Sequence, residues 1–152
     1  MVKRILLFLV LNFTALGIGG LFTGDGVSSD WYQNLDKAPW TPPGWVFGFA
    51  WTSIMVCFAI YMAYLIHSPL NRKRVVLLFS IQWVLNVSWN PIFFYSQNIL
   101  VGMLCITLLT LLIMYLFFSY WKELQFKSIF LAPYLIWLFI ATSLNAYILL
   151  FN

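Results

Sequence analysis

The sequence WYQNLDKAPWTPPGWVFGFAW, residues 31–51, joins a tryptophan-rich polar stretch to the start of a long apolar run. Four of the chain's eight tryptophans lie in it, and Trp and Tyr side chains are enriched where hydrocarbon meets water. Pro42 and Pro43 fix φ and remove backbone donors, so a helix is predicted to begin directly after them, at about Gly44. We therefore predict a shaped aromatic loop that covers one end of a membrane helix and the apolar cavity beneath it.

The composition indicates a membrane protein. Of the 152 residues, 63% are hydrophobic and only 8% are charged, whereas a soluble domain usually has roughly a quarter of its residues charged. The net charge of +4 comes from small basic clusters at the ends of apolar runs, which favours a role in membrane topology over nucleic-acid binding. Cys57 and Cys105 each lie inside an apolar run, without metal-ligand spacing or a disulfide framework.

Five apolar runs are long enough to cross a bilayer whose hydrocarbon core is about 30 Å thick. They cover approximately residues 5–22, 44–66, 75–95, 99–121 and 129–151. The first run could instead be a signal peptide, but it exceeds the usual 7–15-residue signal core, so a retained helix is favoured. We predict an all-α fold: an integral membrane bundle of five transmembrane helices that forms one domain over residues 1–152.

The basic residues predict the orientation of this bundle. With five spans, one side of the membrane holds Lys3, Arg4, Arg72, Lys73, Arg74, Lys122 and Lys127, and the other holds only Lys37. Cytoplasmic loops carry an excess of Lys and Arg. We therefore expect the N-terminus in the cytoplasm, with the C-terminus and the aromatic loop outside.

The third run carries three amides at four-residue spacing, Gln82, Asn86 and Asn90, flanked by Trp89 and Phe93. Amides in hydrocarbon need partners, and a single one often forms an inter-helix hydrogen bond of about 0.6–2 kcal/mol. Three amides in register beside aromatic rings favour a face that lines a cavity.

Two further stripes recur at four-residue spacing. They are Phe47, Trp51 and Met55 in the second run, and Pro133, Trp137, Ala141 and Asn145 in the fifth, with Leu144 adjacent. An aromatic stripe is more often core packing than a binding site, but each of these combines flat rings with small or polar residues. That combination leaves room for a flat ligand.

The positions of the titratable residues limit the kinds of reaction and ion transport that the chain can support. All four acids, Asp25, Asp30, Asp36 and Glu123, fall outside the spans, so no carboxylate within the membrane is available to bind a coupling cation or relay protons. The single histidine, His67, is placed at the cytoplasmic end, across the bilayer from the aromatic loop, and reads as an interfacial residue and not a haem ligand. The sequence offers no Ser-His-Asp or Cys-His arrangement for nucleophilic catalysis.

The chain closely resembles the tryptophan-rich sensory protein family, which includes the mitochondrial translocator protein, or peripheral benzodiazepine receptor. Three runs carry the resemblance: residues 31–51, LNVSWNPIFF (85–94) and PYLIWLFIATSLN (133–145). It implies a five-helix bundle, commonly a homodimer, that binds porphyrins and benzodiazepine-type drugs in a pocket under the first loop. It places at the pocket Tyr32, Pro42, Trp51, Asn86, Trp89, Trp137, Ala141 and Leu144, to which we add Phe93 because it flanks the amide stripe.

The resemblance also implies an activity. Some bacterial members promote light-dependent oxidative breakdown of protoporphyrin, and Trp51 and Trp137 stand at the positions implicated. Because no axial ligand is apparent, metal-free porphyrin is favoured over haem. We expect a bacterial plasma-membrane protein that contacts lipid and a flat apolar ligand and uses no cofactor, metal or nucleic acid; transport or sensing of the same ligand, without chemistry, is the alternative.

Two positions depart from the animal family members. Asn90 replaces a proline of the third-helix motif and adds a polar group near the expected pocket. Tyr147 is followed by ILLFN, without the Arg or Lys that the animal proteins' sterol motif needs. Sterol recognition at that site is therefore not expected.

Overall fold

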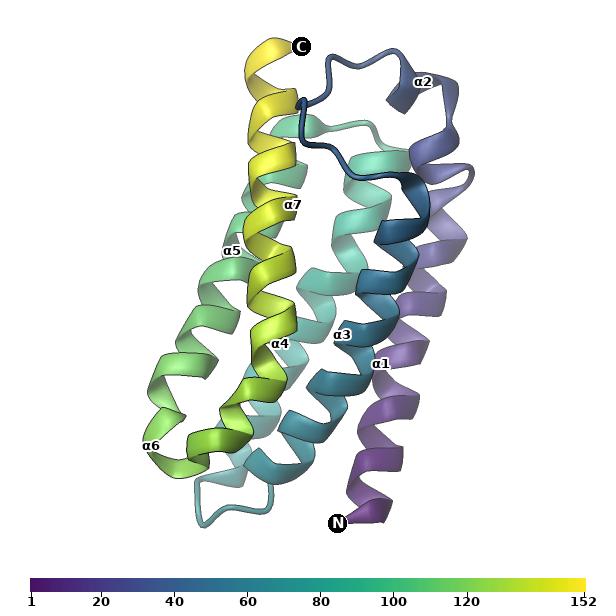
Figure 1. The fold of residues 1–152 in the computed structure, drawn as a ribbon. Helices are drawn as coiled ribbons and strands as arrows, with labels where there is room; N and C mark the ends of the chain where they lie inside the picture. Colours follow the sequence, from purple (N-terminus) through teal and green to yellow (C-terminus); the bar gives the residue numbers. More distant parts are fainter.

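The computed structural model describes all 152 residues and contains helices without any β-strand. Five long helices run between two ends of the molecule, with the N-terminus at one end and the C-terminus at the other (Figure 1). They are α1 (Val2–Thr23), α3 (Gly44–Leu65), α4 (Arg72–Asn90), α5 (Ile99–Ser119) and α7 (Ala132–Phe151). Each lies in a segment long and apolar enough to cross a membrane, which confirms the predicted all-α membrane bundle.

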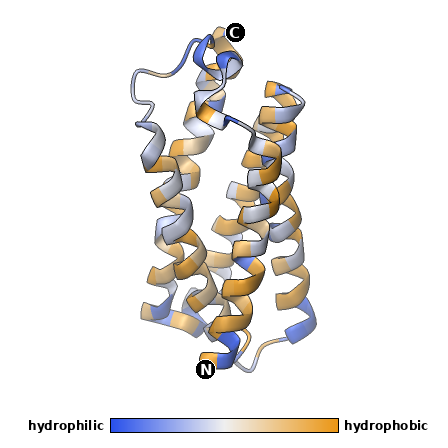
Figure 2. Ribbon diagram, turned by 90° about the vertical axis from the view of Figure 1, so that its right-hand side faces the viewer, coloured by the Kyte–Doolittle hydropathy of each residue, from blue (hydrophilic) through white to orange (hydrophobic).

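The five helices form a closed ring. Helix α1 contacts α3 and α4, α5 contacts α4 and α7, and α3 contacts α7. The interior is therefore bordered by all five helices. Hydrophilic residues gather at the two ends of the bundle, and the long helices between these ends are mostly hydrophobic (Figure 2).

The connection between α1 and α3 forms the loop predicted from the proline-rich stretch. Helix α1 stops at Gly24, whose φ of 56° is a conformation that glycine adopts without strain. A 3₁₀ turn, η1 (Gly26–Ser28), and a short helix, α2 (Asp30–Gln33), follow, and the Ser29 side chain caps α2 by accepting a hydrogen bond from the Tyr32 backbone. An irregular segment then leads to Pro43, and α3 begins at Gly44 as predicted.

The third span changes helical type near its end. The Asn71 side chain accepts hydrogen bonds from the Lys73 and Arg74 backbone, so α4 starts at Arg72, earlier than the predicted residue 75. From Pro91 to Tyr95 the chain forms a π-helical turn, η2. Proline has no N–H and cannot continue the α-helical bonding pattern, which explains why the change occurs there.

The last connection differs most from the prediction. Helix α5 ends at Ser119 and not at residue 121, because Tyr120 leaves the helical conformation with φ −109° and ψ 9°. A short helix, α6 (Trp121–Leu124), and a 3₁₀ segment, η3 (Gln125–Leu131), then precede α7. The α-helix begins at Ala132, later than the predicted residue 129, and Pro133 occupies its first turn, where the missing N–H has no partner to lose.

The half of the bundle near the N-terminus is filled by side chains. Phe58, Tyr61, Ile113 and Leu116 are completely buried there. The Tyr61 hydroxyl donates to the Leu116 carbonyl oxygen at 2.9 Å, which satisfies its polar atom inside the core. The cavities described next lie in the other half, between this core and the loop.

Candidate ligand-binding site

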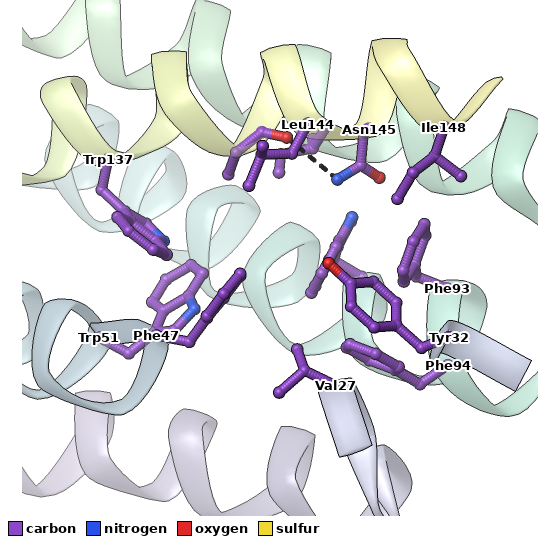
Figure 3. Close-up of a pocket in the computed structure, with 13 residues that line it drawn as sticks. Val27, Tyr32, Phe47, Trp51, Phe93, Phe94, Trp137, Leu144, Asn145 and Ile148 are labelled. Carbon is purple, nitrogen blue, oxygen red and sulfur yellow. Dashed lines mark hydrogen bonds between the residues drawn. The ribbon is translucent and has the colours of Figure 1, made fainter. Parts of the chain in front are cut away.

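An almost wholly apolar cavity, which we call the aromatic chamber, lies beneath the loop (Figure 3). Its wall contains Val27, Tyr32, Phe47, Trp51, Trp89, Phe93, Phe94, Ile106, Trp137, Ala141, Leu144, Asn145 and Ile148. All of these except Asn145 are hydrophobic. They come from the loop and from α3, α4, η2, α5 and α7, so the chamber exists only when the bundle is assembled.

Aromatic rings nearly fill the chamber. The Phe47 ring meets the Trp137 ring edge-on, with centroids 5.3 Å apart, and the Trp89 and Phe93 rings are stacked at 5.0 Å. Trp51, Phe47 and Trp137 lie on one side of the chamber, and Tyr32 and Phe93 lie on the other (Figure 3). The remaining free volume is only about 20 Å³. A large ligand therefore needs the rings to move.

Three polar atoms in the chamber wall are buried without a hydrogen-bond partner. They are the indole nitrogens (Nε1) of Trp89 and Trp137 and the amide oxygen (Oδ1) of Asn145. The Asn145 amide nitrogen is engaged, because it donates to the Ala141 carbonyl oxygen at 3.0 Å. An unsatisfied buried polar group costs about 1–3 kcal/mol. The chamber thus offers two donors and one acceptor to any ligand that brings polar atoms.

A second cavity of about 330 Å³, the side cavity, lies between α1, α3 and α4. The residues that line both cavities are Val27, Phe47, Trp51, Trp89 and Phe94. Asn86 lines the side cavity and not the aromatic chamber. Of the four residues predicted to share one cavity, the structure places Trp137 and Ala141 in the aromatic chamber, Asn86 in the side cavity and Trp51 in both.

The three amides of the α4 stripe have different environments. Gln82 donates from its amide nitrogen to the Tyr134 hydroxyl at 2.8 Å, so it makes an inter-helix hydrogen bond in the core. Asn86 and Asn90 line the side cavity, as the cavity interpretation predicts. Asn90 also accepts a hydrogen bond from the Thr23 hydroxyl at 3.0 Å and packs directly against Gly19, where a side chain would clash with it.

A third cavity of about 440 Å³, the outer cavity, lies under the loop. Pro42 lines this cavity and not the aromatic chamber, and Tyr32 lines both. Burial raises the pKa of the Tyr32 phenol above its ordinary value. The wall also contains Lys37, whose ammonium group donates to the carbonyl oxygens of Tyr32, Gln33 and Leu35.

The loop is attached to the outer face of α7 at two points. The Trp40 indole donates to the Ser143 hydroxyl at 3.1 Å, and its ring packs edge-on against Tyr147. The Asn152 amide bonds to both the N–H and the carbonyl of the Asp36 backbone, at 2.9 and 3.2 Å. These contacts hold the loop over the chamber.

Comparison with known proteins identifies the family. The TspO/MBR family matches residues 6–151, which is nearly the whole chain. The chain belongs to the TspO/MBR family. It is 35% identical to the tryptophan-rich protein TspO of Archaeoglobus fulgidus, with 94% of each chain covered. It is 32% identical to the tryptophan-rich protein TspO of Chlorobaculum tepidum (91% and 89% covered) and 30% identical to the human translocator protein (89% and 85%).

Within this TspO/MBR protein, the aromatic chamber brings together most of the residues chosen from the sequence. Those that line it are Tyr32, Trp51, Trp89, Phe93, Trp137, Ala141 and Leu144. Those that line it but were not chosen are Val27, Phe47, Phe94, Ile106, Asn145 and Ile148. Phe47 and Asn145 stand in the four-residue stripes and could have been selected on that signal. Val27 lies in a 3₁₀ turn. Sequence periodicity does not indicate where such a turn lies relative to the helices.

Proposed function

We propose that this TspO/MBR family member binds flat apolar molecules of the tetrapyrrole class, with protoporphyrin IX as the candidate ligand, in the aromatic chamber. Benzodiazepine-type compounds, which are also aromatic and carry few polar atoms, suit the same wall. The observation that carries the proposal is the chamber itself: its wall contains stacked and edge-on rings together with three buried polar atoms that have no partner in the protein. Flat rings pack well on indole faces, and a few convergent polar groups fix orientation.

The size of the chamber requires that binding displace side chains. Its free volume of about 20 Å³ is far below the 300–1,000 Å³ typical of ligand pockets. Val27 and Phe47 line all three cavities. Movement of the Phe47 ring therefore joins the chamber to two larger spaces, and we place the opening step there.

We further propose that bound porphyrin is oxidised in the light. Dioxygen is the oxidant in both routes that we consider. In the first, excited porphyrin transfers its energy to dioxygen, and the resulting singlet oxygen adds to the porphyrin ring. In the second, excited porphyrin takes an electron from the indole of Trp51 or Trp137 and passes it to dioxygen; the indole radical cation then regains an electron from the porphyrin, and the oxidised porphyrin combines with the superoxide. The reaction needs no acid, base or metal from the protein. The human relative's name, translocator protein, supports transport as the alternative. The completely buried core below the chamber favours binding over passage through the bundle.

The test uses purified protein with protoporphyrin IX, followed by absorption in darkness and in light. Binding shifts and sharpens the porphyrin spectrum in darkness, and illumination in air then removes it faster than in detergent alone. The same protein in sealed vesicles is assayed for net porphyrin movement. Movement without bleaching would replace the oxidation proposal with transport, and an unchanged spectrum in darkness would reject binding.

A further inference from the structure

The two larger cavities beside the aromatic chamber carry opposite charges. The side cavity has Asp25 in its wall and no Lys or Arg, whereas the outer cavity has Lys37 and no Asp or Glu. Lys37 is also the only basic residue in the loop between α1 and α3. A ligand with one anionic edge is therefore attracted to one side of the chamber and repelled from the other.

The Lys37 ammonium lies against the wall of the aromatic chamber. It is 5.5 Å from the centroid of the Tyr32 ring, and Tyr32 lines both the chamber and the outer cavity. Its hydrogen bonds to the carbonyl oxygens of Tyr32, Gln33 and Leu35, at 3.1, 2.7 and 3.3 Å, hold it at the end of α2. All three partners are neutral, so these contacts leave its positive charge without a negative partner. They use all three N–H donors of the ammonium, so a carboxylate that accepts a hydrogen bond from it displaces one of the carbonyl oxygens.

The chamber itself cannot accept an anionic group. Its unpartnered polar atoms are two indole N–H groups and the Asn145 amide oxygen, none of which is charged, and a buried carboxylate without a charged partner is strongly disfavoured. A flat ligand with carboxylates must therefore place them outside the chamber, in a neighbouring space. The outer cavity has the volume, about 440 Å³, and the cation.

We propose that the outer cavity is an anion subsite, in which Lys37 binds the carboxylate edge of a flat ligand whose ring system occupies the aromatic chamber. This inference rests on the proposed function and adds the ligand's orientation and charge preference to it. Lys37 then discriminates anionic from neutral flat ligands.

The experiment compares protoporphyrin IX with its dimethyl ester, which has the same ring system and no carboxylate. Affinities of both are measured in darkness for the wild type and for Lys37→Gln, Lys37→Arg and Asp25→Asn. Lys127→Gln is the matched control, because Lys127 also lies over a tyrosine ring, 4.7 Å from the Tyr64 centroid, but belongs to the connection between α5 and α7. A charge-assisted contact predicts that Lys37→Gln weakens the diacid by about tenfold and the ester by less than about twofold.

The ester separates a charge contact from a structural role of Lys37 in the loop. We expect Lys37→Arg to retain the preference for the diacid, Asp25→Asn to bind it at least as well as the wild type, and Lys127→Gln to change neither ligand. Equal weakening of diacid and ester in Lys37→Gln, or no weakening of either, would overturn the anion subsite while leaving porphyrin binding intact. If the wild type binds neither compound, the proposed function itself fails.

Discussion

Trp51 and Trp137 face the aromatic chamber from α3 and α7, and each also packs edge-on against another ring. Trp51 meets Tyr134 with centroids 6.1 Å apart, and Trp137 meets Phe47 at 5.3 Å. A purely structural role would require only ring area at these positions. The proposed photo-oxidation requires in addition that the rings be easily oxidised, which holds for indole and not for phenyl.

Replacing these indoles by phenylalanine separates the two roles. Trp51→Phe and Trp137→Phe keep much of the stacking surface, so porphyrin affinity should fall by less than about tenfold. The rate of light-dependent porphyrin loss should fall strongly in both variants. Absorption decay under constant illumination measures this rate, with Trp45→Phe as control, because Trp45 lies on α3 but is 72% exposed. If both variants bleach porphyrin at the wild-type rate, the two indoles have only a packing role.

At the scale of the elements, the first turns of α3 place Phe47 where the three cavities meet. Phe47 is half-buried and lines all three cavities. Trp51, one turn later on the same helix, lines only the aromatic chamber and the side cavity. Val27 is the one other residue that lines all three cavities. We therefore expect movement of the Phe47 ring, at the start of α3, to connect the chamber with the two larger spaces.

Phe47→Ala should open the site. We expect porphyrin to associate several-fold faster, since no ring has to move, while the thermal stability falls because the edge-on contact with Trp137 is lost. Stopped-flow quenching of tryptophan fluorescence measures the association rate. Phe49→Ala is the control, because Phe49 is 67% exposed on the same helix and lines none of the three cavities. An association rate no faster than the wild type's would contradict the role given to Phe47.

How much of the arrangement is predictable depends on the kind of signal. Pro42 and Pro43 place the start of α3 correctly, because proline acts locally on its own backbone. The stripes of four-residue spacing select Trp51, Trp137 and Ala141, because one helix face is a local property. By contrast, the position of Asn86 in the side cavity and not in the aromatic chamber depends on side chains from several helices. Val27 lines the chamber from a short turn outside the long helices. Tertiary packing decides both, and no local pattern encodes it.

At the scale of the whole molecule, the basic residues at the N-terminal end make contacts that tie neighbouring helices together. An Arg4 guanidinium nitrogen lies 2.7 Å from the His67 ring nitrogen Nδ1, and Arg74 bonds to the Tyr115 hydroxyl. The Lys127 ammonium lies over the Tyr64 ring. The positive-inside rule predicts that this end faces the cytoplasm, which would put the loop and all three cavities on the outer side.

Single cysteines at the two ends test this orientation. In a background without Cys57 and Cys105, a membrane-impermeant thiol reagent added outside intact cells should label Asn152→Cys and not Lys3→Cys. Both should react after the membrane is permeabilised, which controls for accessibility. Labelling of Lys3→Cys alone from outside would reverse the topology and put the cavities on the cytoplasmic side. The homodimer implied by the family resemblance stays a prediction.

The most direct measurement of the central claim, that the aromatic chamber is the ligand site, is the affinity for protoporphyrin IX of Ala141→Phe. Ala141 is 93% buried in the chamber wall, where a phenyl ring exceeds the free volume of about 20 Å³. We predict graded losses, moderate in Ala141→Thr and at least about tenfold in Ala141→Phe. Ile140→Phe, one residue away and outside the chamber, should bind like the wild type. Wild-type affinity in a folded Ala141→Phe protein would contradict the claim and move the ligand elsewhere.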